Sequence, residues 1–328
     1  MSTSNEFPSE LSAEMRMIMS RVEAELGPLP DPSLLAPAEG RAQSERINER
    51  NNVNLPPVAK AAKVMVEANS HLGSADCRMK VFVPEGAGPG AVLFVHGGGF
   101  AFCSPQTHER CARVLAIETG LPVLVPDYRL APEHPYPNGL HDVVACLRAA
   151  FPATAAVGVE DGPLLVSGDS AGANLALAAM IHEFKAGHAV PAGALLFYGT
   201  YAADFTTSSY QQFAEGPGLT RGKMQRYWNW YCRNEDLRRG PMASPLHASD
   251  STLKALPPLY LLAAGIDPLL SDTLLLADRL KSAGRDSPVS IVPGVTHGFL
   301  QNTNELAAAR EALAAAGEAA RRMIRSSR

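Results

Sequence analysis

The stretch LLVSGDSAGANLAL, at residues 164–177, determines how the rest of the chain is interpreted. An apolar run typical of a strand enters it, and an Ala- and Leu-rich run typical of a helix leaves it. Between them lies the pattern Gly168-x-Ser170-x-Gly172. A serine on such a turn is held in a strained backbone conformation that exposes its hydroxyl, and the glycines leave room for the neighbouring strand and helix. The pattern favours Ser170 as a nucleophile, although the same residues also occur in ordinary turns.

The bulk composition indicates a soluble globular chain. Its 328 residues, 46% of them hydrophobic and 19% charged, suffice for one large α/β domain with an accessory piece or for two modest domains. A formal net charge of −4 offers no basic surface for nucleic acid or an anionic membrane. Apolar runs stay well short of membrane-spanning length. We therefore expect neither a nucleic-acid partner nor a membrane span.

Cysteine usage and the first residues bear on compartment and cofactors. Residues 1–6 lack a basic region followed by an apolar core, so no secretory signal is expected. The five cysteines contain no C-x-x-C pair, which favours reduced thiols in a cytoplasm over a disulfide framework or a zinc site. The sequence therefore predicts a cytoplasmic protein without a metal or another cofactor.

Strand and helix patterns alternate along most of the chain. Expected strands cover residues 63–67, 77–83, 91–95, 122–126, 164–167, 194–198, 259–264 and 289–292. Expected helices of this part cover residues 107–119, 138–150, 171–186 and 305–324. Repeated β-α-β order predicts an α/β fold with a mostly parallel central sheet of about eight strands and helices on both faces.

Two segments break the alternation and are predicted to form a helical cap. Residues 1–52 are the first, with helices expected at 11–26 and 42–51, and residues 201–240 are the second. This divides the catalytic core into residues 53–200 and 241–328. The first helix has one apolar face, consisting of Leu11, Met15, Ile18, Met19, Val22 and Leu26. That face has two interpretations, a lid whose methionines line a pocket entrance or a plain packing extension.

An alcohol attacks a carbonyl at neutral pH only when a base takes its proton and donors stabilise the oxyanion. His297 is the candidate base, because it lies in a loop after the last expected strand and precedes a glycine. Asp267 follows the strand at 259–264 and is the candidate for the acid that orients His297. Asp272 is its rival, but an acidic residue there is better explained as the N-cap of the next helix. The order Ser170, Asp267, His297 is the order expected of a catalytic triad on this kind of sheet.

A second glycine-rich stretch supplies candidate donors. Three consecutive glycines follow the expected buried strand at 91–95 and leave bare backbone N–H groups able to approach a ligand. We assign the oxyanion hole to the amides of Gly98, Gly99 and Ala171, while a flexible turn is the plainer alternative. His96 is expected to position this loop.

Five motifs together resemble the bacterial hormone-sensitive-lipase-like (family IV) carboxylesterases, which are α/β-hydrolases. The motifs are HGGGF at 96–100, DYRLAPEHP at 127–135, GDSAG at 168–172, DPL at 267–269 and HGF at 297–299. The resemblance extends from about residue 60 to the C-terminus, and residues 1–52 match that family's helical cap only in position. It implies that Tyr128 and Arg129 brace the oxyanion loop. Relatives in that family often dimerise through the last strand, so the resemblance leaves both a homodimer and a monomer open.

The combined reading is a serine carboxylesterase acting on small-molecule esters of short- to medium-chain acyl groups through an acyl-enzyme. Met15, Met19, Phe100 and Tyr201 are predicted to contact the substrate. An amidase or formamidase with the same triad is one alternative. Non-catalytic binding of a small ligand is another, since plant gibberellin receptors resemble this family, but they lack the histidine that His297 provides.

Overall fold

The structure, a computed structural model, describes residues 7–326. The expectation about a secretory signal concerns residues 1–6, which lie outside the described residues. No helix between residues 7 and 326 is both long and apolar enough to cross a membrane.

A single eight-stranded sheet forms the centre of the molecule, in the spatial order β1-β2-β4-β3-β5-β6-β7-β8. Strand β2 pairs antiparallel with both β1 and β4. The six strands from β4 to β8 in this spatial order all pair in parallel. The strands are β1 Lys60–Val66, β2 Cys77–Val83, β3 Ala91–Val95, β4 Val123–Pro126, β5 Leu164–Asp169, β6 Gly193–Phe197, β7 Leu259–Ile266 and β8 Val289–Thr296. The predicted mostly parallel sheet of about eight strands is confirmed.

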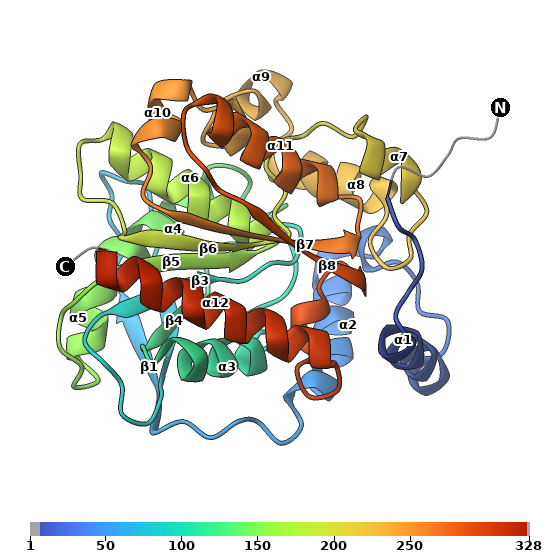
Figure 1. The fold of residues 1–328 in the computed structure, drawn as a ribbon, viewed down its shortest axis with the longest axis horizontal. Coiled ribbons are helices and arrows are strands. Elements are labelled where there is room, and N and C mark those ends of the chain that lie inside the picture. Colours follow the sequence, from blue (N-terminus) through green and yellow to red (C-terminus); the bar gives the residue numbers. More distant parts are fainter. Residues whose placement is uncertain (1–6, 327–328) are drawn as a thin grey trace.

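Helices cover both faces of this sheet (Figure 1). One face carries α3 and α12, which pack on each other, and the other carries α4, α6 and α11. Their bounds are α3 Glu109–Thr119, α4 Asn138–Arg148, α6 Ala171–Lys185, α11 Leu270–Ser282 and α12 Ala307–Ser326, with the short α5 Ala150–Ala155 and α10 Asp250–Ala255 beside them.

Strand β3 shows why the sheet lies between two cores. All five of its residues are buried, which explains its uninterrupted apolar sequence. Successive side chains point to opposite faces, so Leu93 and Val95 join the cluster under α4 and α6, whereas Val92 and Phe94 join the cluster under α3 and α12.

Most of the remaining helices gather beyond the carboxyl ends of the strands, whereas α9 lies near α10 and α11 (Figure 1). They come from the two segments predicted to form a cap. The first supplies α1 Ala13–Leu26, the 3-10 turn η1 Pro32–Leu34, α2 Pro37–Glu49 and the 3-10 turn η2 Arg50–Asn52, and the second supplies α7 Ser208–Gln212, α8 Arg221–Tyr231 and α9 Glu235–Arg238. The helix α2 begins before residue 42, where it was predicted to begin, because Pro37 suits a first helical turn.

Helix α1 is anchored to the core rather than lying loosely on the surface. Ser12 caps it, with its hydroxyl accepting the N–H of Met15 at 3.2 Å. Met15 and Ile18 are buried in the cluster that also contains Val295 and Phe299. The apolar face predicted from the sequence is therefore used, at least in part, for packing.

Candidate active site

Ser170 lies on the sharp turn between β5 and α6. Its backbone has φ 55° and ψ −121°, a region that costs a non-glycine residue about 1–3 kcal/mol. The first turn of α6 lies so close to the end of β3 that a Cβ at Gly172 would lie 2.0 Å from the carbonyl oxygen of Val95. The predicted strained serine turn is thus present, and the residue is 6% exposed.

The side chains of Ser170, His297 and Asp267 form a continuous hydrogen-bonded chain. His297 Nε2 lies 2.8 Å from Ser170 Oγ, and His297 Nδ1 lies 2.7 Å from Asp267 Oδ2. Asp267 is fully buried, and its other carboxylate oxygen accepts the N–H of Leu269 at 2.9 Å. The three residues follow β5, β7 and β8, whose carboxyl ends meet at the same edge of the sheet.

Asp272 is not the helix cap that the sequence suggested. The N-cap position of α11 is Leu269, and Asp272 lies inside the first turn, where its Oδ1 accepts the N–H groups of Tyr201 at 2.8 Å and Ala202 at 3.3 Å. Burial raises the pKa of Asp272 well above its usual range, and the negative charge of Asp267 adds to the shift. Its carboxyl group holds the loop after β6 and is not hydrogen-bonded to His297.

The glycine-rich loop after β3 lies beside Ser170. Gly98 and Gly99 have φ values of 112° and 59°, and a Cβ on Gly99 would lie 2.3 Å from the ring of Tyr227. Within residues 7–326 the N–H groups of Gly98 and Gly99 have no hydrogen-bond acceptor. Ala171 is the first residue of α6, so its N–H lacks an intrahelical partner.

Tyr128 and His96 hold this loop in place, as expected. The Tyr128 hydroxyl donates to the carbonyl of His96 at 2.8 Å, and the two rings stack at 4.4 Å. Burial, with the nearby His108, lowers the pKa of His96 to about 3, so its ring is neutral at physiological pH. Arg129 does not contact the loop as predicted, because its guanidinium is bound instead by Asp142 and Asn138 of α4 at 2.8 Å.

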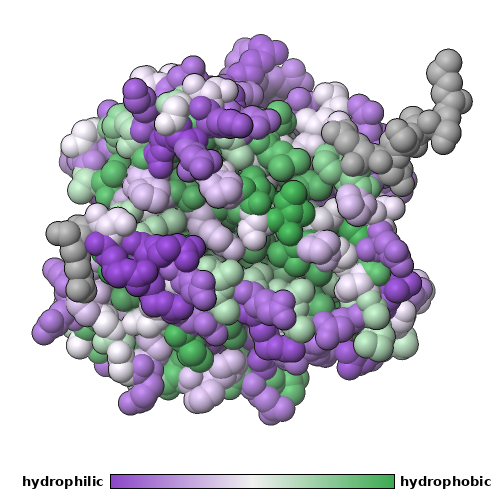
Figure 2. Space-filling view, in the orientation of Figure 1, coloured by the Kyte–Doolittle hydropathy of each residue, from purple (hydrophilic) through white to green (hydrophobic). Residues whose placement is uncertain are grey.

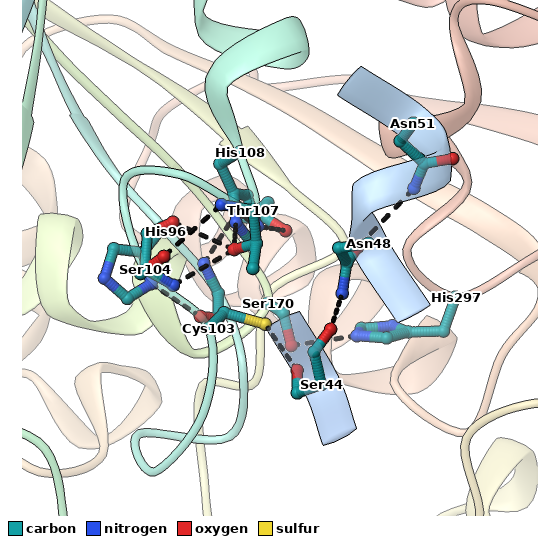
Figure 3. A network of polar contacts seen from close by, with 12 residues as sticks. Ser44, Asn48, Asn51, His96, Cys103, Ser104, Thr107, His108, Ser170 and His297 are labelled. Carbon is teal, nitrogen blue, oxygen red and sulfur yellow. Dashed lines mark hydrogen bonds and ion pairs between the residues drawn. The ribbon is translucent and has the colours of Figure 1, made fainter. Parts of the chain in front are cut away.

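Sequence reasoning missed the pair formed by Asp169 and His108. Asp169 accepts the N–H of Gly97 at 2.8 Å, and its carboxylate lies 3.3 Å from His108 Nε2. Figure 3 shows His108 beside Thr107, whose hydroxyl lies 2.8 Å from His108 Nδ1. Burial by itself would raise the pKa of Asp169, but His108 and the Gly97 N–H outweigh it and lower the pKa. His108 has no sequence signal, because it approaches Asp169 only through the docking of α3. Through its bond to the Gly97 N–H, Asp169 connects the glycine-rich loop to the backbone immediately before Ser170.

A cavity of about 320 Å³ opens onto Ser170, His297, Gly98 and Gly99. Its apolar lining comes chiefly from the cap and from the loop after β3: Val22, Ile47, Phe102, Leu219, Met224 and Tyr227. A larger cleft of about 920 Å³ lies near the amino ends of β5 and β6, remote from these residues.

None of the four predicted substrate contacts lines this cavity. Phe100 is buried under α8, where its ring stacks on Tyr231 at 3.8 Å. Tyr201 is fully buried beside Gly199. Met15 and Met19 face the core near β8. All four were predicted from their apolar residue type, but the packing of α1 turns Met15 and Met19 toward the core, α8 covers Phe100, and Tyr201 packs on Gly199.

Among residues 7–326, no group of three or more His, Cys, Asp or Glu side chains is placed to hold a metal ion. The side chains of Ser170, His297 and Asp267 are hydrogen-bonded to one another instead. The arrangement can therefore activate a hydroxyl through an imidazole and offer backbone N–H groups to a developing negative charge.

Comparison with known proteins agrees with this geometry. A family model described as an alpha/beta hydrolase fold matches residues 92–301. Carboxylesterase NlhH of Mycobacterium tuberculosis is 33% identical over 222 residues, covering 67% of this chain and 70% of that protein. An acetyl esterase of Salmonella paratyphi B is 28% identical over 322 residues, covering 95% of each chain.

A solved structure extends the similarity to the whole fold. An ester-hydrolase from the metagenome of Lake Arreo, in complex with a derivative of bipyridine phosphonate, superposes with a TM-score of 0.86 at 30% identity, covering 94% of this chain and 98% of that one. The chain therefore belongs to the α/β-hydrolases, within the hormone-sensitive-lipase-like (family IV) group of carboxylic ester hydrolases.

Proposed function

We propose that this protein is a serine carboxylesterase in which Ser170 is the nucleophile, His297 the general base and Asp267 the residue that orients the imidazole. The observation that carries the proposal is the unbroken chain of contacts from Ser170 Oγ through His297 to Asp267, at 2.8 Å and 2.7 Å. His297 takes the hydroxyl proton as Ser170 attacks the ester carbonyl, and returns it to the leaving alcohol. Water then attacks the acyl-enzyme by the same route and releases the acid.

The carbonyl oxygen becomes negatively charged in each tetrahedral intermediate and needs donors. We assign this role to the N–H groups of Gly98, Gly99 and Ala171, which border Ser170 and have no other acceptor in the described chain. Loss of one such donor costs about 10²- to 10³-fold in kcat in a comparable enzyme. Asp169 and Tyr128 act as positioning residues, since both hold the loop that carries these N–H groups.

The substrates we propose are small esters with short- to medium-chain acyl groups. Support comes from the size of the cavity, about 320 Å³, and from the cap residues that close it. We propose that residues 1–52 and 201–240 form this cap over a core made of residues 53–200 and 241–328. The two cap segments are joined by Arg226 of α8, whose guanidinium donates to Ser33 at 2.7 Å and pairs with Asp31. All five cysteines are unpaired, which supports a cytoplasmic location.

The test of the mechanism is Ser170→Ala. We expect kcat on 4-nitrophenyl acetate to fall about 10⁴- to 10⁶-fold, because the triad acts as a unit, and His297→Ala to cost about as much. Wild-type enzyme should show a burst of 4-nitrophenol and should be labelled at Ser170 by a small phosphonate. Ser282→Ala, an exposed serine at the end of α11, is the matched control and should keep full activity.

Retention of a tenth of the activity by a folded Ser170→Ala enzyme would remove Ser170 from this role. Faster cleavage of a matched anilide than of the ester would indicate an amidase. A protein that neither hydrolyses the ester nor reacts with phosphonate would be a binding protein on the same fold.

Ile47 tests the assignment of the cavity. Each buried methylene is worth about 0.8 kcal/mol, so a pocket closed by α2 should discriminate steeply among acyl lengths. Ile47→Ala enlarges the cavity from its cap side, and we expect the preferred acyl chain, roughly two to eight carbons in wild type, to lengthen. The measurement is kcat/KM over 4-nitrophenyl esters of increasing length. Ile117→Ala, exposed on α3, is the control, and identical profiles for all three proteins would contradict the assignment.

A further inference from the structure

The glycine-rich loop after β3 has a strained backbone. Gly98, Gly99 and Phe100 are three consecutive residues with positive φ, at 112°, 59° and 63°, and Cys103 adds a φ of 66°. Positive φ suits glycine, but a bulky residue such as phenylalanine adopts it only under strain. Such a conformation persists only where the surroundings fix the backbone. The shape of this loop therefore depends on what packs against it.

Two core residues hold the beginning of the loop. The hydroxyl of Tyr128 and the carboxylate of Asp169 bind the backbone at residues 96 and 97, just before the glycines assigned to the oxyanion hole. The carbonyl of Gly98 then accepts the N–H of Phe102 at 2.9 Å, which closes a turn inside the loop. Further contacts to this turn come from the two cap segments.

Helix α8, in the second cap segment, packs aromatic rings on the loop. The ring of Phe100 stacks on Tyr231 with centroids 3.8 Å apart and planes 6° from parallel, and it meets Trp228 edge-on at 5.4 Å. The ring of Phe102 meets Tyr227 edge-on at 5.6 Å. Phe100 and Phe102 are 1% and 3% exposed. Both phenylalanines of the strained loop are therefore buried against α8.

The ring of Tyr227 also lies directly on Gly99. The three atoms nearest to a Cβ built on Gly99 all belong to this ring, at 2.3, 2.5 and 2.8 Å. The N–H of Gly99 is one of those assigned to the oxyanion. A cap side chain is therefore in contact with the backbone that carries a proposed donor.

Helix α2, in the first cap segment, holds the same loop through Arg41. Arg41 Nε donates to the carbonyl of Ala101 at 2.8 Å, and Nη2 donates to the carbonyl of Ala131 at 2.9 Å. The N–H of Ala131 donates in turn to the carbonyl of Phe100 at 2.9 Å. The guanidinium thus connects the turn to the chain after β4, and both cap segments contact the loop.

We propose that Arg41, Tyr227 and Tyr231 are positioning residues for the oxyanion hole, so that the cap governs the rate of the chemical step as well as the choice of acyl chain. This inference rests on the proposed esterase function of Ser170. An N–H group stabilises the oxyanion only within hydrogen-bond distance of it, and loss of one donor costs about 10²- to 10³-fold in kcat. A loop released from the cap holds its donors less accurately, which weakens binding of the transition state more than binding of the ester.

Tyr231 gives the sharpest test, because it does not line the cavity and its loss removes no contact with the substrate. In Tyr231→Leu we expect kcat and kcat/KM on 4-nitrophenyl acetate to fall together, by about tenfold or more, with KM nearly unchanged. That pattern marks an interaction made only in the transition state. Tyr231→Phe keeps the ring and removes a buried hydroxyl that has no partner among residues 7–326, so it should restore the rate.

Arg41→Met is the second variant and should show the same pattern, since it removes the bonds to Ala101 and Ala131. It also decides the question if Tyr231→Leu does not fold. Arg46→Met removes an exposed arginine of the same helix and is its matched control. Tyr260→Leu removes a half-buried tyrosine ring at the amino end of β7, remote from the loop, and is the control for Tyr231→Leu. Both controls should keep wild-type rates per active molecule.

Inhibition by 1,1,1-trifluorobutan-2-one reports on the oxyanion hole directly. Ser170 Oγ adds to the ketone carbon, the hydroxyl proton passes to His297, and the carbonyl oxygen becomes an oxyanion. The inhibition constant should rise in Tyr231→Leu and Arg41→Met by the factor by which kcat/KM falls. A purely structural loss would lower the number of active molecules, which titration with a phosphonate counts, and would leave the inhibition constant unchanged.

Folded Tyr231→Leu and Arg41→Met enzymes with wild-type kcat, or with a raised KM alone, would overturn the positioning role and leave the esterase function standing. An equal loss of kcat in Tyr260→Leu would also overturn it, because general destabilisation would then explain the effect. Wild-type protein that does not react with the phosphonate would instead refute the proposed function itself.

Discussion

Two buried aspartates, five residues apart, have different surroundings and therefore different proposed roles. Asp267 faces His297 Nδ1 at 2.7 Å, whereas Asp272 accepts two backbone N–H groups of the loop after β6. Burial, with the negative charge of Asp267, raises the pKa of Asp272 well above its usual range. Only the first carboxylate can select the imidazole tautomer that accepts the serine proton.

At this scale we predict that Asp267→Asn lowers kcat by about 10³- to 10⁴-fold without unfolding the protein, because the amide favours the wrong tautomer. Asp272→Asn should keep most of the activity, since an amide oxygen can still accept the N–H groups of Tyr201 and Ala202. Steady-state rates on 4-nitrophenyl acetate, with circular dichroism as the folding control, decide between them. If Asp272→Asn proved the more damaging change, Asp267 would not be the orienting acid.

Helices α4 and α6 are joined by an ion pair that contributes to stability far from the active site. Arg148 of α4 donates to both carboxylate oxygens of Glu183 of α6 at 2.8 Å, and Glu183 is 2% exposed. Burial would raise the pKa of Glu183, but its bonds to Arg148, His182 and His188 outweigh burial and lower it. A carboxylate whose pKa falls on folding stabilises the protein above the unfolded value, about 4.3, and this stabilisation is lost as the pH falls through the folded pKa.

We therefore predict that Arg148→Met lowers the free energy of unfolding by about 2–3 kcal/mol at pH 7, less than for a fully buried pair because Arg148 is partly exposed. The difference from wild type should narrow as the pH falls below the unfolded value, about 4.3, because the stabilisation of the folded carboxylate is then progressively lost. Thermal and urea unfolding from pH 7 to 3 measure this. Arg239→Met, which breaks an exposed pair with Asp236, is the control, and an equally large loss there would show that charge alone is responsible.

At the scale of the whole molecule, the sheet ends at β8, which has only β7 as a neighbour. Figure 2 shows apolar side chains between α11 and α12, where Figure 1 places this edge. Ile291 of β8 is 46% exposed and Leu275 of α11 39% exposed. An uncovered apolar edge strand is a template for pairing with a second chain.

We predict a homodimer in which β8 pairs with β8 of a second copy. Ile291→Lys should convert it to a monomer, because it places a charge in the centre of the contact. Light scattering after size exclusion, at several protein concentrations, measures the mass. Leu237→Lys, on the exposed part of α9, is the matched control. A wild-type protein that is monomeric at every concentration, or a dimer that persists in Ile291→Lys, would exclude this interface.

The sheet, its covering helices and the positions of Ser170, Asp267 and His297 at the ends of strands could be predicted from the sequence. Those features are local: a buried parallel strand is an apolar run in the sequence, Ser170 and Asp267 directly follow such strands, and His297 directly follows the edge strand β8. Because the carboxyl ends of parallel strands share one edge, the three residues could be expected to meet without knowledge of any other contact.

The residues that line the cavity could not be predicted from the sequence and are known only from the tertiary packing. Met15, Met19, Phe100 and Tyr201 have the apolar character of pocket residues, but tertiary packing turns them inward, whereas the polar residues Asn51 and Gln301 are among those that line the cavity. His108 likewise reaches Asp169 only through the docking of α3. Contacts with elements distant in sequence set which face of a cap helix lines the cavity. Residue periodicity identifies the apolar face of a helix but does not show what that face packs against.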